Sequence, residues 1–328
     1  MKKAVLTTSI ACFSVLILVV GCKKSDTTST PTTIQETALS AQVSQSAVDQ
    51  TTIENDNDAI ATDATKATET VPAFNSSTKV TGLFGAPSGV DSTKDSTSYK
   101  WFIIDRSPIA RGFKRMVLRY LGLWENNRVM KQGYITIELI KGTKWTDTGA
   151  ILKETDSVSL TYRDGKTRIY QNTRFVTNVS GGFYNLKNQT NPFIYTMHAT
   201  GSVIFDNGTQ RTYWIARRNT FSKTAPYPFT TNGDTTYMGT LCSIGGTTRY
   251  GASFWVESPQ AISSSAQFGY TSPTQGKRKL NYTGVATVTL TFGVDTTGNQ
   301  VATGIQPYGY KVDWTKLNGK QGSAIIAY

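Results

Sequence analysis

Residues 283–292 read TGVATVTLTF, and their alternation is the clearest strand signal in the chain. Threonine occupies positions 283, 287, 289 and 291, whereas glycine or an apolar residue occupies every second position from 284 to 292. Successive side chains of a β-strand point to opposite faces of its sheet. The stretch therefore predicts a strand with one dry face and one solvated face, as in an antiparallel sheet.

Short strands with turn signals continue this pattern from Trp101 onward. Residues 134–139 place Ile135, Ile137 and Leu139 on one face, and residues 157–162 alternate in the same way. Asp-Gly and Asn-Gly turns at residues 163–166 and 206–209 separate such runs, because glycine tolerates the positive φ of a tight hairpin turn. The sequence predicts a mostly β protein with a large antiparallel sheet, arranged as a sandwich, an open-ended barrel or a long, bent meander.

Three further segments carry mixed signals. Residues 113–124 fit the spacing of a helix that would begin at Ser107-Pro108, and they also fit a strand. We interpret them as a strand because the segments that follow are strands. Residues 81–98, which contain several glycines and Pro87, are interpreted as a loop. Residues 277–279 read KRK and are predicted to lie at a solvated sheet edge or turn.

The N-terminus has the pattern of a bacterial lipoprotein leader. Residues 1–3 read MKK and an apolar run follows to Val20, which is typical of a secretory signal. Val19, Gly21 and Cys22 match a lipobox, so residues 1–21 are predicted to be a signal peptide and Cys22 to carry palmitate-type acyl chains. A retained transmembrane segment is the alternative. Lys23 favours the outer membrane as the destination.

The predicted domain organisation follows from composition. Residues 22–98 are rich in Ser, Thr, Ala and Asp, which predicts a flexible tether. A short helix starting near Thr33 is compatible with the apolar spacing in this segment. We therefore expect a signal peptide (1–21), a disordered or partly helical tether (22–98) and an antiparallel β domain (99–328). Outside the leader and Cys22, Cys242 is the one remaining cysteine, so no intramolecular disulfide is expected.

Charge is distributed unevenly along the chain, whose net charge is +12. Residues 22–80 carry four lysines and eight acidic side chains, whereas residues 81–328 carry 28 basic and 14 acidic side chains. A strongly basic domain attracts anionic partners, such as lipopolysaccharide or another anionic envelope polymer. Simple solubility is the plain alternative. Nucleic acid would fit the charge, but it does not fit an exported, membrane-attached protein.

The order of strand and turn signals from about residue 112 onward resembles a family of uncharacterised Bacteroidota-type secreted lipoproteins. The resemblance implies a location in the cell envelope and a β-rich architecture, and it implies no established activity. The matching motifs are those of strands and turns. Cysteines are frequent in the outer repeats of the family, and this chain has none at those positions. The matching residues are 115–122, 128–137, 201–212, 249–251, 277–279, 284–291, 310–314 and 318–320.

The sequence offers little catalytic chemistry. His198 is the single histidine, which argues against a histidine-built metal site, and no Gly-x-Ser-x-Gly elbow is present. We interpret His198 as structural or exposed on a strand, and Cys242 as a small buried apolar residue. No catalytic residue, metal or cofactor is expected. The weakest candidates are the carboxylates Glu138 and Glu257, since glycoside hydrolysis requires a carboxylate pair.

Aromatic residues offer the better candidate for binding. Tyr213 and Trp214 lie in a run that ends in two arginines, and Trp255 lies two residues before Glu257. Exposed aromatic rings on a sheet can stack on sugars or bases, although packing in a β core is their usual role. Alternation predicts that Arg211, Tyr213, Ile215 and Arg217 share one face of a strand, with Trp214 on the other.

These observations lead to two hypotheses about function. The first is a membrane-anchored envelope lipoprotein whose basic β domain has a structural or binding role without catalysis. The alternative is a carbohydrate-binding or carbohydrate-cleaving accessory lipoprotein of the cell surface. The positions of Tyr213, Trp214 and Trp255 distinguish them, because only residues that line an exposed groove could bind a sugar.

Overall fold

The computed structural model describes residues 32–70, 74, 90–91, 102–105, 114–125, 128–182, 191–222, 228–265, 267–268 and 272–328. Two compact units divide the chain, Met1–Ala38 and Leu39–Tyr328. The first unit is described only from residue 32, at the start of helix α1 (Thr32–Thr70). Cys22 and the predicted signal peptide lie outside the described residues. All contacts discussed below belong to the second unit.

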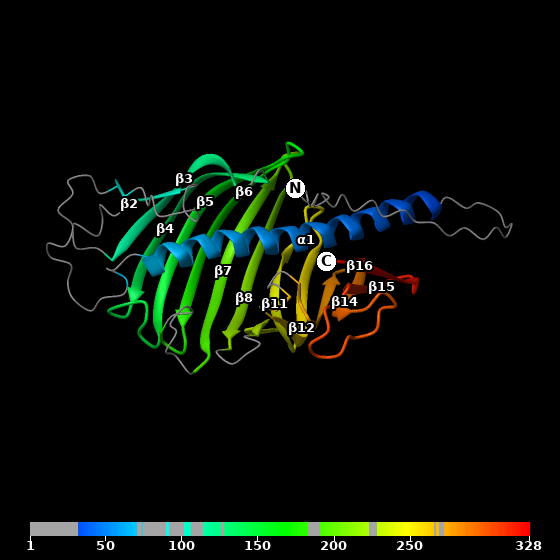
Figure 1. Cartoon of the computed structure of the whole chain (residues 1–328). Helices are drawn as coiled ribbons and strands as arrows, with labels where there is room; N and C mark the ends of the chain where they lie inside the picture. The colour runs from blue at the N-terminus through cyan, green and yellow to red at the C-terminus, as the bar shows by residue number, and fades with distance from the viewer. Residues whose placement is uncertain are drawn as a thin grey trace, which may run out of the picture. The chain divides into compact units, whose positions relative to one another are not determined.

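One large antiparallel sheet dominates the second unit (Figure 1). Strands β1 to β8 lie side by side in chain order, and β11 to β16 continue the sheet beyond β8. β10 pairs with β11, while β9 pairs with both β8 and β12. The mostly β class and the large antiparallel sheet are confirmed, and the arrangement is a meander.

The strands differ widely in length, from two to thirteen residues. Their bounds are β1 Val90–Asp91, β2 Phe102–Asp105, β3 Arg115–Glu125, β4 Val129–Lys141, β5 Ala150–Tyr162, β6 Thr167–Asn178, β7 Phe193–Phe205, β8 Gln210–Phe221, β9 Phe229–Gly233, β10 Thr235–Tyr237, β11 Thr240–Thr247, β12 Ser253–Ser264, β13 Gln275–Tyr282, β14 Ala286–Val294, β15 Gly309–Lys316 and β16 Gln321–Ala327.

Most strand predictions are confirmed. The segment that fitted both helix and strand is strand β3. Ile135, Ile137 and Leu139 of β4 are buried, as their alternation predicts. The Asp-Gly turn closes the β5–β6 hairpin, where the Tyr162 amide donates to the Lys166 carbonyl over 2.9 Å. Hairpin turns with a glycine at positive φ were therefore correctly recognised.

Three local predictions were wrong. Residues 283–285 form the turn between β13 and β14, so the TGVATVTLTF strand begins only at Ala286. Residues 277–279 belong to β13, which lies between β12 and β14, and Arg278 is buried. Three consecutive basic residues suggest a solvated edge when no acidic partner is apparent in the sequence nearby. Here the partner of Arg278 is Glu54 of helix α1, which is distant in the sequence. Of the predicted 81–98 loop, the described residues Val90–Asp91 form β1, and the rest lies outside the described residues.

Helix α1 lies in the middle of residues 22–98, the segment predicted to be a disordered or partly helical tether. A helix near Thr33 was expected, but it extends over 39 residues. Ile53, Ile60, Ala64 and Ala67 are buried at helical spacing. Polar side chains fill the rest of the buried face: Ser46, Asp49, Gln50, Asp56, Asn57, Asp63 and Thr68. The helix is therefore stabilised by tertiary contacts rather than by a continuous apolar stripe.

Helix α1 crosses the strands on one face of the sheet (Figure 1). Asp63 contacts β3 and β4, Asp56 contacts β5 and β6, and Glu54 contacts β8 and β13. We call the face that contacts α1 the inner face and the opposite face the outer face. Because side chains alternate along each strand, every long strand contributes to both.

Candidate functional site

The inner face is basic, and acidic side chains of α1 pair with it. Glu54 lies at the centre: its Oε2 accepts from Arg217 Nη2 over 2.6 Å and also contacts Arg278. Asp49 accepts two hydrogen bonds from Arg249, each 2.7 Å long. Five basic residues form ion pairs with the helix: Lys131, Arg168, Arg217, Arg249 and Arg278. The acidic side chains of α1 thus neutralise part of the basic inner face.

Two further aspartates of α1 hold tyrosines of the sheet. Asp56 accepts from Tyr162, Tyr170 and Arg168, and Asp63 accepts from Tyr120 and Lys131. Burial, reinforced by Asp56, raises the pKa of Tyr170 well above its ordinary value. This tyrosine therefore stays protonated and donates a charge-assisted hydrogen bond.

A second ionic cluster lies within the sheet itself. Arg174, fully buried on β6, contacts Glu154 over 2.8 Å and Asp156 over 2.7 Å. Burial raises the pKa of both carboxyls, although Arg174 opposes the shift. Asn172 connects this cluster to α1, because its amide donates to both Asp156 and Asn57. These residues order the inner face and leave it closed to an external ligand.

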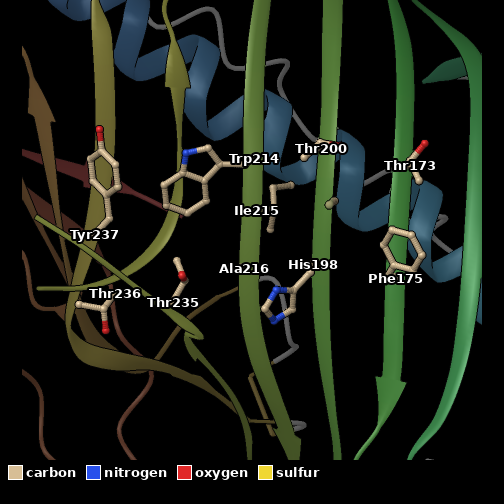
Figure 2. A pocket seen from close by; sticks show the side chains of 11 residues that line it. Thr173, Phe175, His198, Thr200, Trp214, Ile215, Ala216, Thr235, Thr236 and Tyr237 are labelled. Atoms are coloured by element: carbon tan, nitrogen blue, oxygen red, sulfur yellow. The ribbon is translucent and has the colours of Figure 1, made fainter.

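The outer face carries an open groove. Figure 2 shows side chains of β6, β7 and β8 on one side of the groove and the β10 segment on the other, with α1 behind the strands. The depression has a volume of about 290 Å³, at the small end of ligand sites. Its lining combines aromatic rings with threonine hydroxyls: Thr173, Phe175, His198, Thr200, Trp214, Thr235, Thr236 and Tyr237, with Ala199, Ile215 and Ala216 at its base.

An aromatic row begins in the groove with Trp214 and Tyr237 and continues beyond its lining to Trp255. The Tyr237 ring centroid lies 5.9 Å from that of Trp214 and 5.8 Å from that of Trp255. Gly245 of β11 pairs with Trp214 on one side and Trp255 on the other. A Cβ at Gly245 would lie 2.5 Å from Trp214 Cζ2, so glycine is required for the indole to lie across β11.

A histidine–aspartate pair stands beside the aromatic row. His198 Nε2 lies 2.7 Å from Asp234 Oδ2, and the His198 side chain is 51% exposed. The contact fixes the imidazole at the groove while leaving its other nitrogen available to a hydroxyl group. The sequence prediction of an exposed strand histidine agrees with this position.

The structure separates the three predicted stacking residues. Trp214 and Trp255 lie on the outer face and share contact with Tyr237. Tyr213 is instead buried on the inner face, where its hydroxyl contacts Asn57 and Asn172. Its role is structural, so the prediction of a stacking role for Tyr213 is not supported by its position. Alternation correctly placed Arg211, Ile215 and Arg217 on the same buried face.

The structure also separates the two predicted carboxylates. Glu138 is exposed on β4, whereas Glu257 on β12 accepts from Asn281 over 2.7 Å. Six strand steps separate β4 from β12, which at about 4.8 Å per step amounts to roughly 29 Å along the sheet. A glycosidase pair requires about 5 to 9.5 Å. Cys242 is buried, as predicted.

Sequence reasoning missed Phe175, Tyr237 and Asp234. Tyr237 stands on the three-residue strand β10, and its approach to two tryptophans depends on the register of β8, β11 and β12. Phe175 carried a usable signal, since it alternates with the buried Arg174 and Val176. An apolar residue on the solvated face of a strand is a reason to look for a binding surface.

Comparison with known proteins identifies no relative: no family model, curated protein or solved structure matches this chain. Among the described residues, no helix combines the length and apolar character needed to cross a bilayer. In the same residues, no three histidine, cysteine or acidic side chains gather into a metal-sized cluster.

Proposed function

We propose that this protein is a lipid-anchored envelope protein that binds an uncharged carbohydrate chain on its outer face without cleaving it. One observation carries the proposal: an open groove in which Trp214, Tyr237 and Phe175 stand beside several threonine hydroxyls. Aromatic faces pack against the C–H faces of sugar rings, and hydroxyls exchange hydrogen bonds with the ring substituents.

The size of the aromatic surface supports a chain rather than a single sugar. Phe175 lies on β6 and Trp255 on β12, four strand steps apart, or roughly 19 Å at about 4.8 Å per step. The groove is open to the surface rather than a closed cavity. A polysaccharide running across the strands could therefore contact several rings at once.

The charge distribution favours an uncharged ligand over an anionic polymer. Five basic residues of the inner face pair with acidic side chains of α1 and are therefore not available to an anionic partner. Among the residues that line the groove, the one basic side chain is His198, which pairs with Asp234; the lysine and arginine nearest the lining, Lys153 and Arg218, lie outside it. Lipopolysaccharide phosphates would find no cluster of arginines among the residues that line the groove.

A non-catalytic role is supported by the same residues. Asp234 beside the groove is paired with His198, Glu257 is paired with Asn281 and Lys279, and Glu138 lies several strands away. Hydrolysis of a glycosidic bond requires a second carboxylate on the opposite side of the bond. The residues that line the groove therefore favour carbohydrate binding over hydrolysis.

The anchor is proposed from Cys22 and the leader that precedes it. Membership of the Bacteroidota-type lipoprotein family and an outer-membrane location remain part of this proposal. Palmitate labelling of intact cells should mark the parent protein and not Cys22→Ser, which should appear in the soluble fraction. Labelling of Cys22→Ser equal to that of the parent would contradict the anchor.

Carbohydrate binding is tested on the unlipidated Cys22→Ser chain with an array of neutral polysaccharides. Trp214→Ala and Tyr237→Ser should each weaken binding about tenfold or more, since a stacked ring contributes about 1–3 kcal/mol. Tyr250→Ser is the matched control, because Tyr250 is similarly exposed but does not line the groove. A parent chain that binds no array member would refute the proposed ligand class.

A further inference from the structure

A second apolar surface lies on β3 and β4, away from the groove. Leu121, Leu123 and Trp124 of β3 and Tyr134 of β4 are each 42–50% exposed. Tyr134 pairs with Arg119, two residues from Leu121, so their side chains are diagonal neighbours on one sheet surface. We call these four residues the β3–β4 patch.

Local backbone geometry brings this patch to the sheet surface. The register of β3 against β4 shifts between Leu121 and Trp124, at Gly122, whose φ is +70°. A bulge of this kind redirects the side chains that follow it. Trp124 pairs with Met130 and so shares the sheet face of Leu121 and Tyr134, while Leu123, within the bulge, is exposed next to it. Among the described strands, β2 pairs with β3 only through Tyr120, so Leu121–Glu125 has β4 as its described neighbour.

Basic side chains border the patch. Arg119, Arg128 and Arg163 are exposed, and the pairing of Val129 with Tyr162 brings the turns that carry Arg128 and Arg163 to the same end of the sheet. The acidic residues nearby are already paired: Glu125 contacts Lys131 over 2.9 Å, and Asp164 contacts Lys166 over 2.9 Å. The border is therefore positive around an apolar centre.

We propose that the β3–β4 patch docks on the surface of a lipid bilayer that contains anionic headgroups. Tryptophan and tyrosine favour the membrane–water interface, leucines insert into the acyl boundary, and arginines bind anionic headgroups. The positive border distinguishes this occupant from a neutral polysaccharide. The inference rests on the proposed anchor only in so far as the anchor brings the protein to a membrane.

The test uses vesicle flotation of a chain that begins at Lys23, so that neither the apolar leader nor acyl chains on Cys22 can cause binding. The chain should float with vesicles containing phosphatidylglycerol and much less with vesicles of phosphatidylcholine alone, and added salt should weaken flotation. Leu123→Ser with Trp124→Ser should reduce partitioning about tenfold or more. Leu241→Ser, at a similarly exposed leucine outside the patch, should float like the parent.

Folding and competing explanations are controlled separately. The urea midpoint of the double variant must match that of the parent for its loss of flotation to count. Absence of flotation by the parent, or equal flotation by the double variant, overturns the proposal. Self-association in sedimentation velocity that the double variant abolishes would identify an interface between copies and also overturn it. Trp214→Ala should float normally, so a failure of carbohydrate binding leaves this proposal intact.

Discussion

The two faces of the same strands differ in how their polar groups are used. On the inner face, Arg217 and Tyr213 are buried and bonded to residues of α1. One residue away on β8, Trp214 stands on the outer face beside an open groove. The comparison shows that charged side chains of the inner face bind the helix, whereas the groove on the outer face presents aromatic rings and hydroxyls.

The difference also bears on the prediction of an anionic partner from net charge. An excess of basic residues in the β domain suggested an anionic ligand. Much of the compensating acid lies in α1 and occupies the inner face at short distance. Buried ion pairs of this kind are sensitive to loss of one partner. The predictions below test the inner face first and the outer face last.

The largest effect is expected for Glu54→Gln. The substitution leaves Arg217 and Arg278 buried without their shared carboxylate, and it should cost about 3–5 kcal/mol in the free energy of unfolding. Urea unfolding measures the loss. Glu138→Gln is the matched control, since Glu138 is exposed and should change stability by less than about 0.5 kcal/mol. Equal urea midpoints for Glu54→Gln and the parent would show that α1 does not depend on this cluster.

Acid should weaken the inner face through the same group. Burial acts to raise the pKa of Glu54, but Arg278 and Arg217 outweigh it and lower the pKa to about 2 from an ordinary 4.5. A carboxyl with a depressed folded-state pKa contributes stability above its unfolded pKa, and that contribution is lost as the pH falls from about 4.5 to about 2. The loss should amount to about 3 kcal/mol.

The pH effect is best measured as a difference between two proteins. Glu154 and Asp156 act in the opposite sense, because burial raises their pKa and acid therefore favours their folded, protonated forms. Subtracting the pH profile of Glu54→Gln from that of the parent removes such common contributions. Parallel profiles from pH 4.5 down to pH 2 would contradict the assignment to Glu54.

Local sequence patterns were sufficient to predict the strands and hairpins. They were insufficient to predict the helix that packs on the inner face of the sheet. Alternation correctly grouped Arg211, Tyr213, Ile215 and Arg217, but it could not say that a helix more than a hundred residues earlier covers them. The signal in α1 was present: its buried residues recur every three or four positions, from Ser46 to Ala67. It was missed because six of those ten positions are polar, whereas amphipathic helices are usually recognised by apolar residues.

The groove was predictable only in part for a related reason. Trp214 and Trp255 were recognised as aromatic residues near strands, but their common neighbour Tyr237 comes from a short segment outside the main strand order. Contacts between strands distant in sequence depend on register, which bulges such as that between Cys242 and Ile244 alter. Sequence alternation cannot locate the partner strand or the shift.

The smallest stability effect, and the most direct test of the outer face, is expected for Gly245→Ala. The added Cβ would meet the Trp214 indole at 2.5 Å and should displace the ring, at a cost of about 1–3 kcal/mol in unfolding free energy. Binding to the neutral polysaccharide found on the array should fall with it, because the displaced ring no longer lies beside Tyr237 in the groove. The double variant Gly245→Ala with Trp214→Ala provides the control, since removing the indole removes the clash. If the indole is the obstacle, adding Gly245→Ala to Trp214→Ala should cost less than about 0.5 kcal/mol. An equal cost in both backgrounds would assign the role of Gly245 to the backbone of β11 and not to the aromatic row.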